Sequence, residues 1–263
     1  MAPIMFLMKR SNGQFIFAAL IILSAAILCT SHADAPAAVH QNNSQDPSQT
    51  KRNDRQQAPE ATPQRREENK KPPDATRYVY EFTQPQFIIH HIVIAHDATG
   101  RGNITFEKLG EAVPIEEPVE LSISSLGRIL GLWTELGFLD SKENYQSSKQ
   151  FANMGTMRIT MENGDRKRTA EFNWSNNKQA FALVTEYRRV ADQAVFVFDV
   201  SVARENQPLD TPKLMDELES MLKRADLSDP LQLVPLLTDL RTDEHVPLIT
   251  RNHADRLLKK IEK

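Results

Sequence analysis

The stretch from residue 155 to residue 174 constrains the fold more than any other part of the chain, because it has the pattern of a β-hairpin. Apolar and polar side chains alternate on both sides of Asn163-Gly164. This dipeptide readily adopts the positive φ angles of a two-residue turn. A turn centred on this dipeptide fixes which residues face each other. The pairs that it predicts are Met161–Arg166, Ile159–Arg168, Met157–Ala170 and Gly155–Phe172.

The alternation gives this hairpin two different faces. The pairs above form a largely apolar face, and the opposite face is polar and solvent-facing. The polar face carries Thr156, Arg158, Thr160, Lys167, Thr169 and Glu171. On it, Arg158 lies diagonal to Glu171, and this pair becomes the best candidate site if the polar face proves to be buried.

A sheet with one apolar face needs a covering layer, and the flanking segments have helical periodicity. We therefore expect an α+β fold, with an antiparallel sheet of about five strands covered by helices and a C-terminal helical cap. Three segments before the hairpin alternate in hydropathy as strands do: residues 78–83, 87–96 and 104–108. A loop marked by prolines is expected from there to residue 118.

Capping residues predict where the helices begin and end. Ser122 or Ser124 caps a helix with an apolar stripe at helical spacing, and Gly137 ends it. Within it, Gly127 and Gly131 are poor helix formers. Glycine at these positions therefore suggests that the helix packs closely on the sheet.

A second helix starts after the Ser-Asn-Asn cluster at residues 175–177. Residues 195–202 are rich in β-branched side chains and could form a strand, but we favour continued helix to about residue 205 because no breaker intervenes. Three proline motifs open further helices in the last part of the chain: Thr211-Pro212, Asp229-Pro230 and Val246-Pro247.

The first 33 residues have the composition of a signal peptide or a membrane anchor. Lys9 and Arg10 precede an apolar run of 15 residues at positions 15–29. A spanning helix needs about 20 apolar residues, whereas the apolar core of a signal needs roughly 7–15. Small residues near Ala33 and Ala35 suit cleavage, and an uncleaved anchor over residues 15–31 is the alternative. Both interpretations place the rest of the chain in the periplasm or another extracytoplasmic space.

Residues 34–76 have the composition of a disordered linker. Val39 is their only large aliphatic residue, and they contain no aromatic side chain. Such a segment buries too little apolar area to offset its loss of conformational entropy on folding. We therefore expect an α+β domain over residues 77–206 and the helical cap over residues 207–263.

The charge distribution argues against nucleic acid as the main partner. The net charge of the whole chain is −3. Residues 1–33 carry a net charge of +2 and residues 34–76 a net charge of zero, so residues 77–263 carry −5. Phosphate contacts need a basic face. Contact with a membrane is expected only through the N-terminal segment, if it is uncleaved.

Several motifs follow one another in a fixed order between residues 78 and 194. They are an early strand pair, a turn with Asp97, Gly100 and Gly102, a helix ending in Gly137-Phe138-Leu139, then Tyr145, then a hairpin and a helix. In this order they resemble an uncharacterised family of exported bacterial α+β domains, although this chain lacks the early cysteines often found there. The family has no assigned activity, so the resemblance implies a fold alone. The C-terminal helices resemble a single HEAT-like repeat, whereas solenoids need at least about three.

Histidines are the first candidates for chemistry. His90, His91 and His96 lie on one predicted strand beside Asp97. His90 and His96 share a predicted face but lie about 20 Å apart at roughly 3.3 Å per residue, and His91 faces the other side. Three ligands do not converge, so no metal site is expected and surface or capped imidazoles are favoured.

Other polar segments have structural explanations as well. Residues 97–104 have the outline of a calcium loop, but Arg101 and Lys108 occupy positions where oxygen ligands belong, and a hairpin turn explains the glycines. Asp199 lies in an apolar run and is expected to pair with an arginine. The loop at residues 140–153 is either functional or a simple crossover; it carries Tyr145, Gln146, Lys149 and Phe151.

No catalytic or cofactor-binding motif is recognisable, so no catalytic residue, metal ligand or cofactor is predicted. The only cysteine is Cys29, so residues after it have neither a disulfide nor a thiol nucleophile. We favour an exported, non-enzymatic module that binds a protein or an envelope polymer. The alternative is a hydrolase built around His91 and Asp97. A deep pocket with converging ionisable groups would favour the enzyme, and a flat exposed apolar patch would favour binding.

Overall fold

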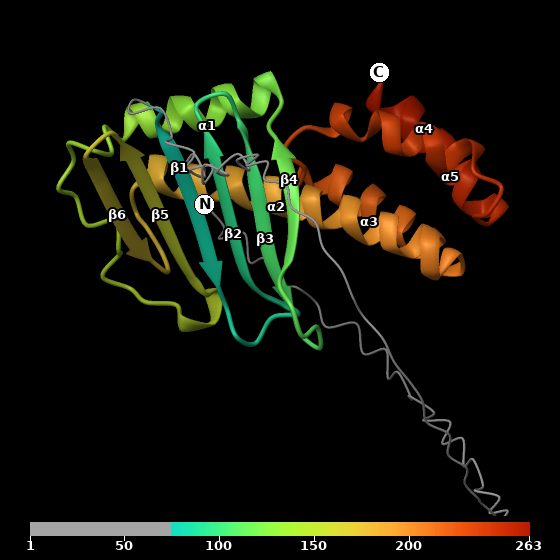
Figure 1. The fold of residues 1–263 in the computed structure, drawn as a ribbon, viewed down its shortest axis with the longest axis horizontal. Coiled ribbons are helices and arrows are strands. Elements are labelled where there is room, and N and C mark those ends of the chain that lie inside the picture. Colours follow the sequence, from blue (N-terminus) through green and yellow to red (C-terminus); the bar gives the residue numbers. More distant parts are fainter. Residues whose placement is uncertain (1–74) are drawn as a thin grey trace, which may run out of the picture. The chain divides into compact units, whose positions relative to one another are not determined.

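The computed structural model describes residues 75–263. The predicted signal or anchor and the predicted linker up to residue 74 lie outside the described residues. The described part is α+β, with one antiparallel sheet and five α-helices (Figure 1). The strands are β1 (Arg77–Thr83), β2 (Ile89–Asp97), β3 (Arg101–Lys108), β4 (Ile115–Glu120), β5 (Thr156–Asn163) and β6 (Arg166–Phe172). The helices are α1 (Ile123–Glu135), α2 (Lys178–Asn206), α3 (Thr211–Arg224), α4 (Val234–Thr242) and α5 (Leu248–Ile261).

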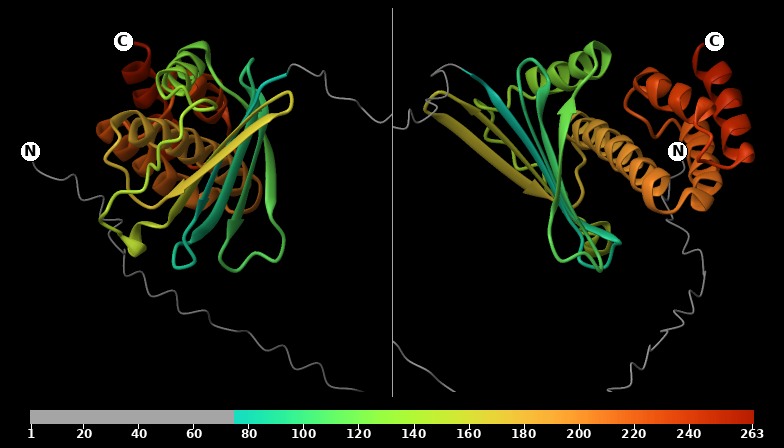
Figure 2. Two further views of the ribbon diagram at one scale, coloured as in Figure 1. Left: turned by 90° about the vertical axis from the view of Figure 1, so that its left-hand side faces the viewer. Right: turned by 45° about the vertical axis from the view of Figure 1, so that its right-hand side comes forward.

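The sheet has six strands in the order β4-β3-β2-β1-β5-β6, one more than predicted. Helices α1 and α2 cover one of its faces (Figure 2). The additional strand is β4, which lies where the prolines predict a loop. Its Val119 is buried in the core, while Pro118 is exposed. Proline is tolerated there because an edge strand leaves outward N–H groups unpaired in any case.

The hairpin forms between β5 and β6, but its register differs from the prediction. Asn163 pairs with Arg166, so the turn residues are Gly164 and Asp165. Only Gly164 has a positive φ angle (+56°), as at the first central position of a type II′ turn. The pairing moves by two residues along one strand, and such a step preserves the faces because side chains alternate with a period of two.

The predicted faces of the hairpin are therefore confirmed, except that Thr160 of the polar face is buried, at 9% exposure, with its hydroxyl 2.9 Å from that of Thr169. On the apolar face Ile159 is fully buried and now pairs with Ala170. On the polar face the Arg158 side chain is 46% exposed and lies directly opposite Glu171, not diagonal to it. One face of the hairpin thus packs in the core, and the other face forms part of an open surface.

Helix α1 has the predicted ends. Ser122 is its N-cap, and Gly137 follows the last turn with a φ angle of +49°. The two internal glycines, however, do not pack on the sheet. Gly127 and Gly131 are exposed, and a Cβ atom at either would meet no other atom within 4 Å. Close packing is thus not the reason for glycine at these positions.

Helix α2 has 29 residues and includes positions 195–202, which confirms the helical interpretation of that segment. Its first half packs on the sheet, whereas Phe196 and Val200 belong to a second apolar cluster with the cap helices. Burial among other helices thus outweighs the β-propensity of this segment. Asp199 pairs with Lys108 of β3, not with an arginine as predicted.

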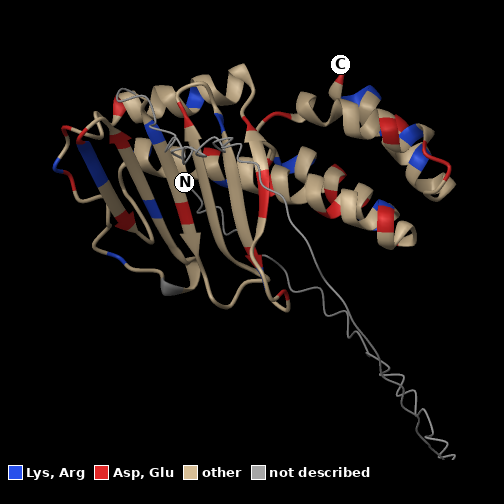
Figure 3. Cartoon of the chain, viewed as in Figure 1, with Lys and Arg blue, Asp and Glu red and all other residues tan. Residues whose placement is uncertain are grey.

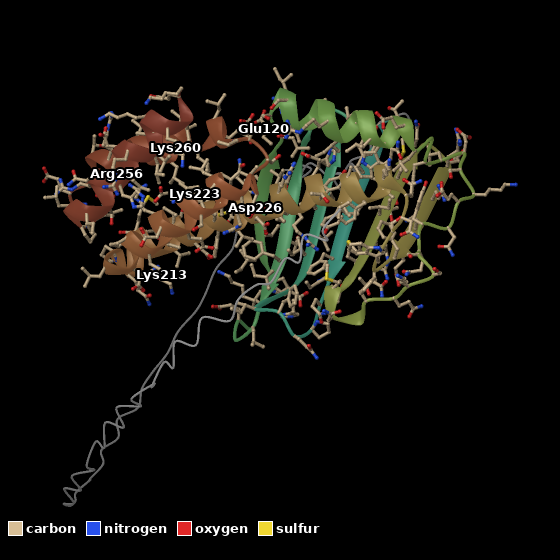
Figure 4. All side chains as sticks on the ribbon, turned by 180° about the vertical axis from the view of Figure 1, so that it is seen from behind. Glu120, Lys213, Lys223, Asp226, Arg256 and Lys260 are labelled. Atoms are coloured by element: carbon tan, nitrogen blue, oxygen red, sulfur yellow. The ribbon has the colours of Figure 1, made fainter. Side chains whose placement is uncertain are left out.

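Two of the three proline motifs begin cap helices as predicted: Pro212 lies in the first turn of α3, and Pro247 directly precedes α5. Pro230 instead opens a 3-10 turn, Pro230–Leu233, and α4 begins only at Val234. Charged side chains such as Lys213, Lys223 and Arg256 lie on these helices (Figure 4). No helix in the described range from residue 75 onward combines the length and apolarity needed to cross a membrane.

We expect the two faces of the hairpin to differ sharply in their contribution to stability. Ile159→Ala should lower the free energy of unfolding by about 2–5 kcal/mol, because it opens a cavity in the core. Arg158→Ala should cost less than about 1 kcal/mol, because its ion pairs are partly exposed. Urea denaturation of both variants of the full chain tests this order. If Arg158→Ala is the more destabilising change, the assignment of the faces is wrong.

Candidate functional site

The face of the sheet that points away from α1 and α2 is the candidate site. No element between residues 75 and 263 covers it (Figure 2). Figure 3 shows that acidic and basic residues are both spread over these strands. The register of the six strands arranges most of the charged side chains in two groups, one near each end of the strands, with Glu116 between them on β4.

The first group, the charged row, crosses all six strands with alternating sign. Its members in order are Lys167, Glu162, Arg77, Asp97, Arg101 and Glu120. The outermost pairs are ion pairs, with 2.7 Å between Lys167 Nζ and Glu162 Oε1 and 3.5 Å between Arg101 Nε and Glu120 Oε1. Opposite charges on adjacent strands stabilise the sheet modestly, and their alternation leaves the row with no net charge.

Asp97 also closes the turn between β2 and β3. Its Oδ1 accepts hydrogen bonds from the backbone N–H groups of Thr99 (2.8 Å) and Arg101 (3.2 Å) and from the Thr99 hydroxyl (2.6 Å). Partial burial opposes ionisation, but these hydrogen bonds outweigh it and lower the pKa of Asp97. The segment at residues 97–104 is thus a hairpin turn with Gly100 at a φ angle of +83°, as the alternative to a calcium loop predicts.

The second group, the His–Glu–Arg network, crosses β3, β2, β1, β5 and β6. It consists of Glu107, His90, His91, Glu81, Arg158 and Glu171. His91 Nδ1 lies 2.9 Å from Glu107 Oε1, and its Nε2 lies 3.2 Å from Glu81 Oε1. Arg158 continues the network through Glu81 and Glu171, at 2.8 Å in each case.

A bulge in β2 brings His90 into the same network. The pairing of β2 with β3 shifts between Ile89 and His91, and His90 Nε2 then lies 3.1 Å from Glu107 Oε2. The prediction that His90 and His91 point to opposite faces is therefore wrong. An unbulged strand alternates strictly, whereas a bulge allows two consecutive side chains to meet one partner.

The network favours a protonated His91. Partial burial acts to lower the pKa of His91, but the hydrogen bonds with Glu107 and Glu81 outweigh it and raise this pKa. The hydrogen bond with His91 also lowers the pKa of Glu107. A protonated imidazole can donate to both carboxylates at once, whereas a neutral one can donate to only one of them.

Smaller side chains lie between the two charged groups. Val79, Val93, Ala95 and Thr105 are each half-buried on this face. Three of them line a shallow hollow of about 370 Å³, whose wall includes Arg77, Asp97, Arg101, Asn103 and Glu116. The surface is thus a broad, open face with fixed charges around a less polar centre, which is a shape suited to another surface rather than to an enclosed small molecule.

The residues of the hydrolase alternative do not come together. His91 and Asp97 lie at opposite ends of β2, about 20 Å apart at roughly 3.3 Å per residue. Both ring nitrogens of His91 face carboxylates, so neither is available to activate a nucleophile. Over residues 75–263, no cluster of three or more His, Cys, Asp or Glu side chains is placed to hold a metal ion.

His96 is a core residue, so of the two expected alternatives, a surface or a capped imidazole, only the capped one describes it. It is 2% exposed, and its Nε2 lies 2.8 Å from the hydroxyl of Tyr187 on α2. Trp133 Nε1 donates to the same hydroxyl at 3.0 Å, and His96 Nδ1 lies 2.7 Å from the carbonyl oxygen of Asp97. A neutral His96 with its proton on Nδ1 satisfies this chain, since Tyr187 then donates to Nε2.

Protonation of His96 would break that chain, because its Nε2 could no longer accept. Burial accordingly lowers the pKa of His96, while hydrogen bonding to the Asp97 backbone opposes this change. A lowered pKa in the folded state means that stability is fully present above the unfolded value, about 6.5, and falls as the pH drops below it. The raised pKa of His91 has the opposite sign, and its stabilisation is lost as the pH rises.

We therefore expect His96→Gln and His91→Gln to change the pH dependence of stability in opposite directions. Between pH 8 and pH 5, His96→Gln should reduce the acid loss of unfolding free energy, and His91→Gln should increase it. Urea unfolding at both pH values measures the difference. A change of the same sign in both variants would contradict the assignment of the two histidines.

The loop at residues 140–153 acts mainly as an ordered crossover. Tyr145 is buried in the core beside Phe138 and Phe172. The Gln146 amide is bonded to Asn173 twice, through the backbone N–H at 2.9 Å and the side-chain oxygen at 3.0 Å. Lys149 and Phe151, in contrast, are exposed, Phe151 at 38%.

The sequence pattern did not single out Glu81 and Glu107, which connect the His–Glu–Arg network. The alternation of each strand places both glutamates on the polar face, and this was a detectable signal. Which residues they meet, however, depends on how β1 and β3 align with β2, and the local sequence does not show this alignment. Comparison with known proteins adds no relative: no protein-family model and no curated protein matches this chain.

Proposed function

We propose that this chain is an exported, non-enzymatic binding module whose open sheet face contacts a protein in the cell envelope. The observation that supports this proposal is the broad open face with its His–Glu–Arg network and charged row. These groups are fixed by one another before any partner arrives. Such preorganisation lowers the entropy cost of forming an interface.

The charge pattern favours a protein over a uniformly charged polymer. Signs alternate along the charged row, so it has no continuous field of one sign that would attract a nucleic acid or a polyanionic glycan. A protein surface of mixed charge can complement both signs, and such complementarity provides specificity and register. The less polar centre around Val93 and Ala95 supplies area for desolvation between these charges.

The proposed location rests on the sequence. The basic start and apolar run of the first 33 residues are typical of export, and the polar composition of residues 34–76 suits a tether or spacer. A module of this kind would act in the periplasm or at the extracytoplasmic side of the membrane, attached to it if the N-terminal segment is retained.

We expect the native protein to be found outside the cytoplasm. Mass spectrometry of its N-terminus should find cleavage near Ala33 or Ala35, or an intact N-terminus in the membrane fraction if the segment is an anchor. An intact N-terminus on a protein confined to the cytosol would refute the proposed location.

The sheet-face interface can be tested with two matched substitutions. Thr105→Arg places a long side chain in the hollow of the open face, whereas Thr134→Arg makes the same change at an exposed site on α1. Crosslinking in intact cells followed by purification should recover a partner with the wild-type chain and with Thr134→Arg. We expect a loss of at least about tenfold with Thr105→Arg, the scale of a disrupted interface centre. Equal recovery with both variants would place the interface elsewhere.

A further inference from the structure

Three aromatic side chains, a half-buried Trp174 between the exposed Phe151 and Phe181, form a cluster beyond the end of β6. Trp174 follows this strand, Phe181 lies in the first turns of α2, and Phe151 ends the long loop. The ring centroid of Trp174 lies 5.2 Å from that of Phe151 and 5.4 Å from that of Phe181, with interplanar angles of 62° and 58°. Phe151 and Phe181 are 38% and 45% exposed.

This cluster is separate from the two apolar cores. None of its three aromatic residues belongs to the buried cluster under the sheet or to that of the cap, so their exposure is not explained by core packing. Beside them is an open hollow of about 310 Å³, which we call the aromatic hollow. Its lining residues are Trp174, Ser175, Asn176, Asn177, Lys178 and Phe181.

The backbone around the aromatic hollow is held in place on both sides. The Trp174 carbonyl accepts a hydrogen bond from Ser147 N–H at 2.8 Å. The Asn177 side chain caps α2 by accepting from Ala180 N–H at 2.9 Å, and its Nδ2 donates to Glu143 at 3.0 Å. Rings positioned by such contacts lose little conformational entropy when a ligand stacks on them.

We propose that the aromatic hollow binds a pyranose ring of an uncharged polysaccharide. The C–H groups on one face of a sugar ring carry partial positive charge, and the faces of aromatic rings carry partial negative charge, so the two stack favourably. Around the rings, the exposed amide of Asn176 and the ammonium of Lys178 offer donors and an acceptor for sugar hydroxyls. The lining thus combines two aromatic rings with polar groups, and such a combination is typical of small-ligand sites.

Other ligands that stack on aromatic rings fit this hollow less well. A quaternary ammonium group prefers an aromatic cage without a neighbouring cation, and Lys178 lines this hollow. Single-stranded nucleic acid also stacks on aromatic rings, but it needs a basic groove along its backbone. The −5 net charge of residues 77–263 provides no such field. An apolar peptide would leave the amide and ammonium groups without partners.

The sugar site goes beyond the proposed function and does not depend on it. None of its lining residues belongs to the charged row or to the His–Glu–Arg network. A chain that no longer contacts a protein through the sheet face should still bind sugar. The two sites together would let the module hold an envelope protein close to a neutral glycan.

Tryptophan fluorescence provides a direct test, because the chain has two tryptophans and Trp133 is 2% exposed. Acrylamide quenching therefore reports mainly on Trp174. We expect saturable protection of Trp174 by at least one of three neutral probes, chitohexaose, cellohexaose or maltohexaose. Phe181→Ala should weaken that binding by at least about tenfold, as for removal of a central aromatic contact. Ile123→Ala, at an exposed apolar site on α1, should leave it unchanged.

Control measurements separate loss of binding from loss of folding. The urea midpoint of Phe181→Ala should remain close to that of the wild-type chain, since Phe181 is outside both cores. Choline and a single-stranded oligonucleotide serve as competing ligand classes. Protection by either of these but by none of the three sugars, no protection by any probe, or unchanged sugar binding by Phe181→Ala would overturn the proposal.

Discussion

The hydroxyl of Tyr187 joins the layers on which the rest of the structure depends. It receives a hydrogen bond from Trp133 of α1 and lies 2.8 Å from His96 of β2, while the ring stacks on Tyr80 of β1 at 5.1 Å. Both covering helices are thereby fixed to the two central strands. Because Tyr187 is fully buried, loss of one partner would leave a polar group unsatisfied, which costs about 1–3 kcal/mol.

This arrangement makes α2 the element shared by both parts of the fold. Its first half closes the sheet core, and its second half supplies Phe196 and Val200 to the cap. The ion pair between Lys108 and Asp199 adds a polar connection between β3 and the second half of the helix. Since α1 and α2 pack on one face of the sheet, the charged side chains of the other face contact each other across the strands and not a helix.

The open face is held together by charged side chains, whereas the core is held together by apolar ones. Many of its charged side chains form ion pairs with each other across the strands, and they surround a half-buried centre. Paired charges of alternating sign favour a complementary protein surface over a polymer of one sign. The aromatic hollow has the opposite character, with exposed rings and few charges, and suits a neutral ring-shaped ligand. One small chain can therefore present two chemically distinct contacts.

The sequence by itself determined the features that depend on local periodicity and local caps. These include the two faces of the hairpin, the regions of the two helix caps at residues 122–124 and 175–177, and the proline-led starts of the cap helices, while the helical state of residues 195–202 was favoured over a strand. Only the tertiary structure decided the hairpin register, the sixth strand, the bulge at His90 and the burial of His96. A two-residue shift preserves side-chain faces, so periodicity cannot distinguish one register from the other. The network through Glu81 and Glu107, and the meeting of Phe151 with Trp174 and Phe181, likewise depend on contacts between segments far apart in the chain, which local patterns do not encode.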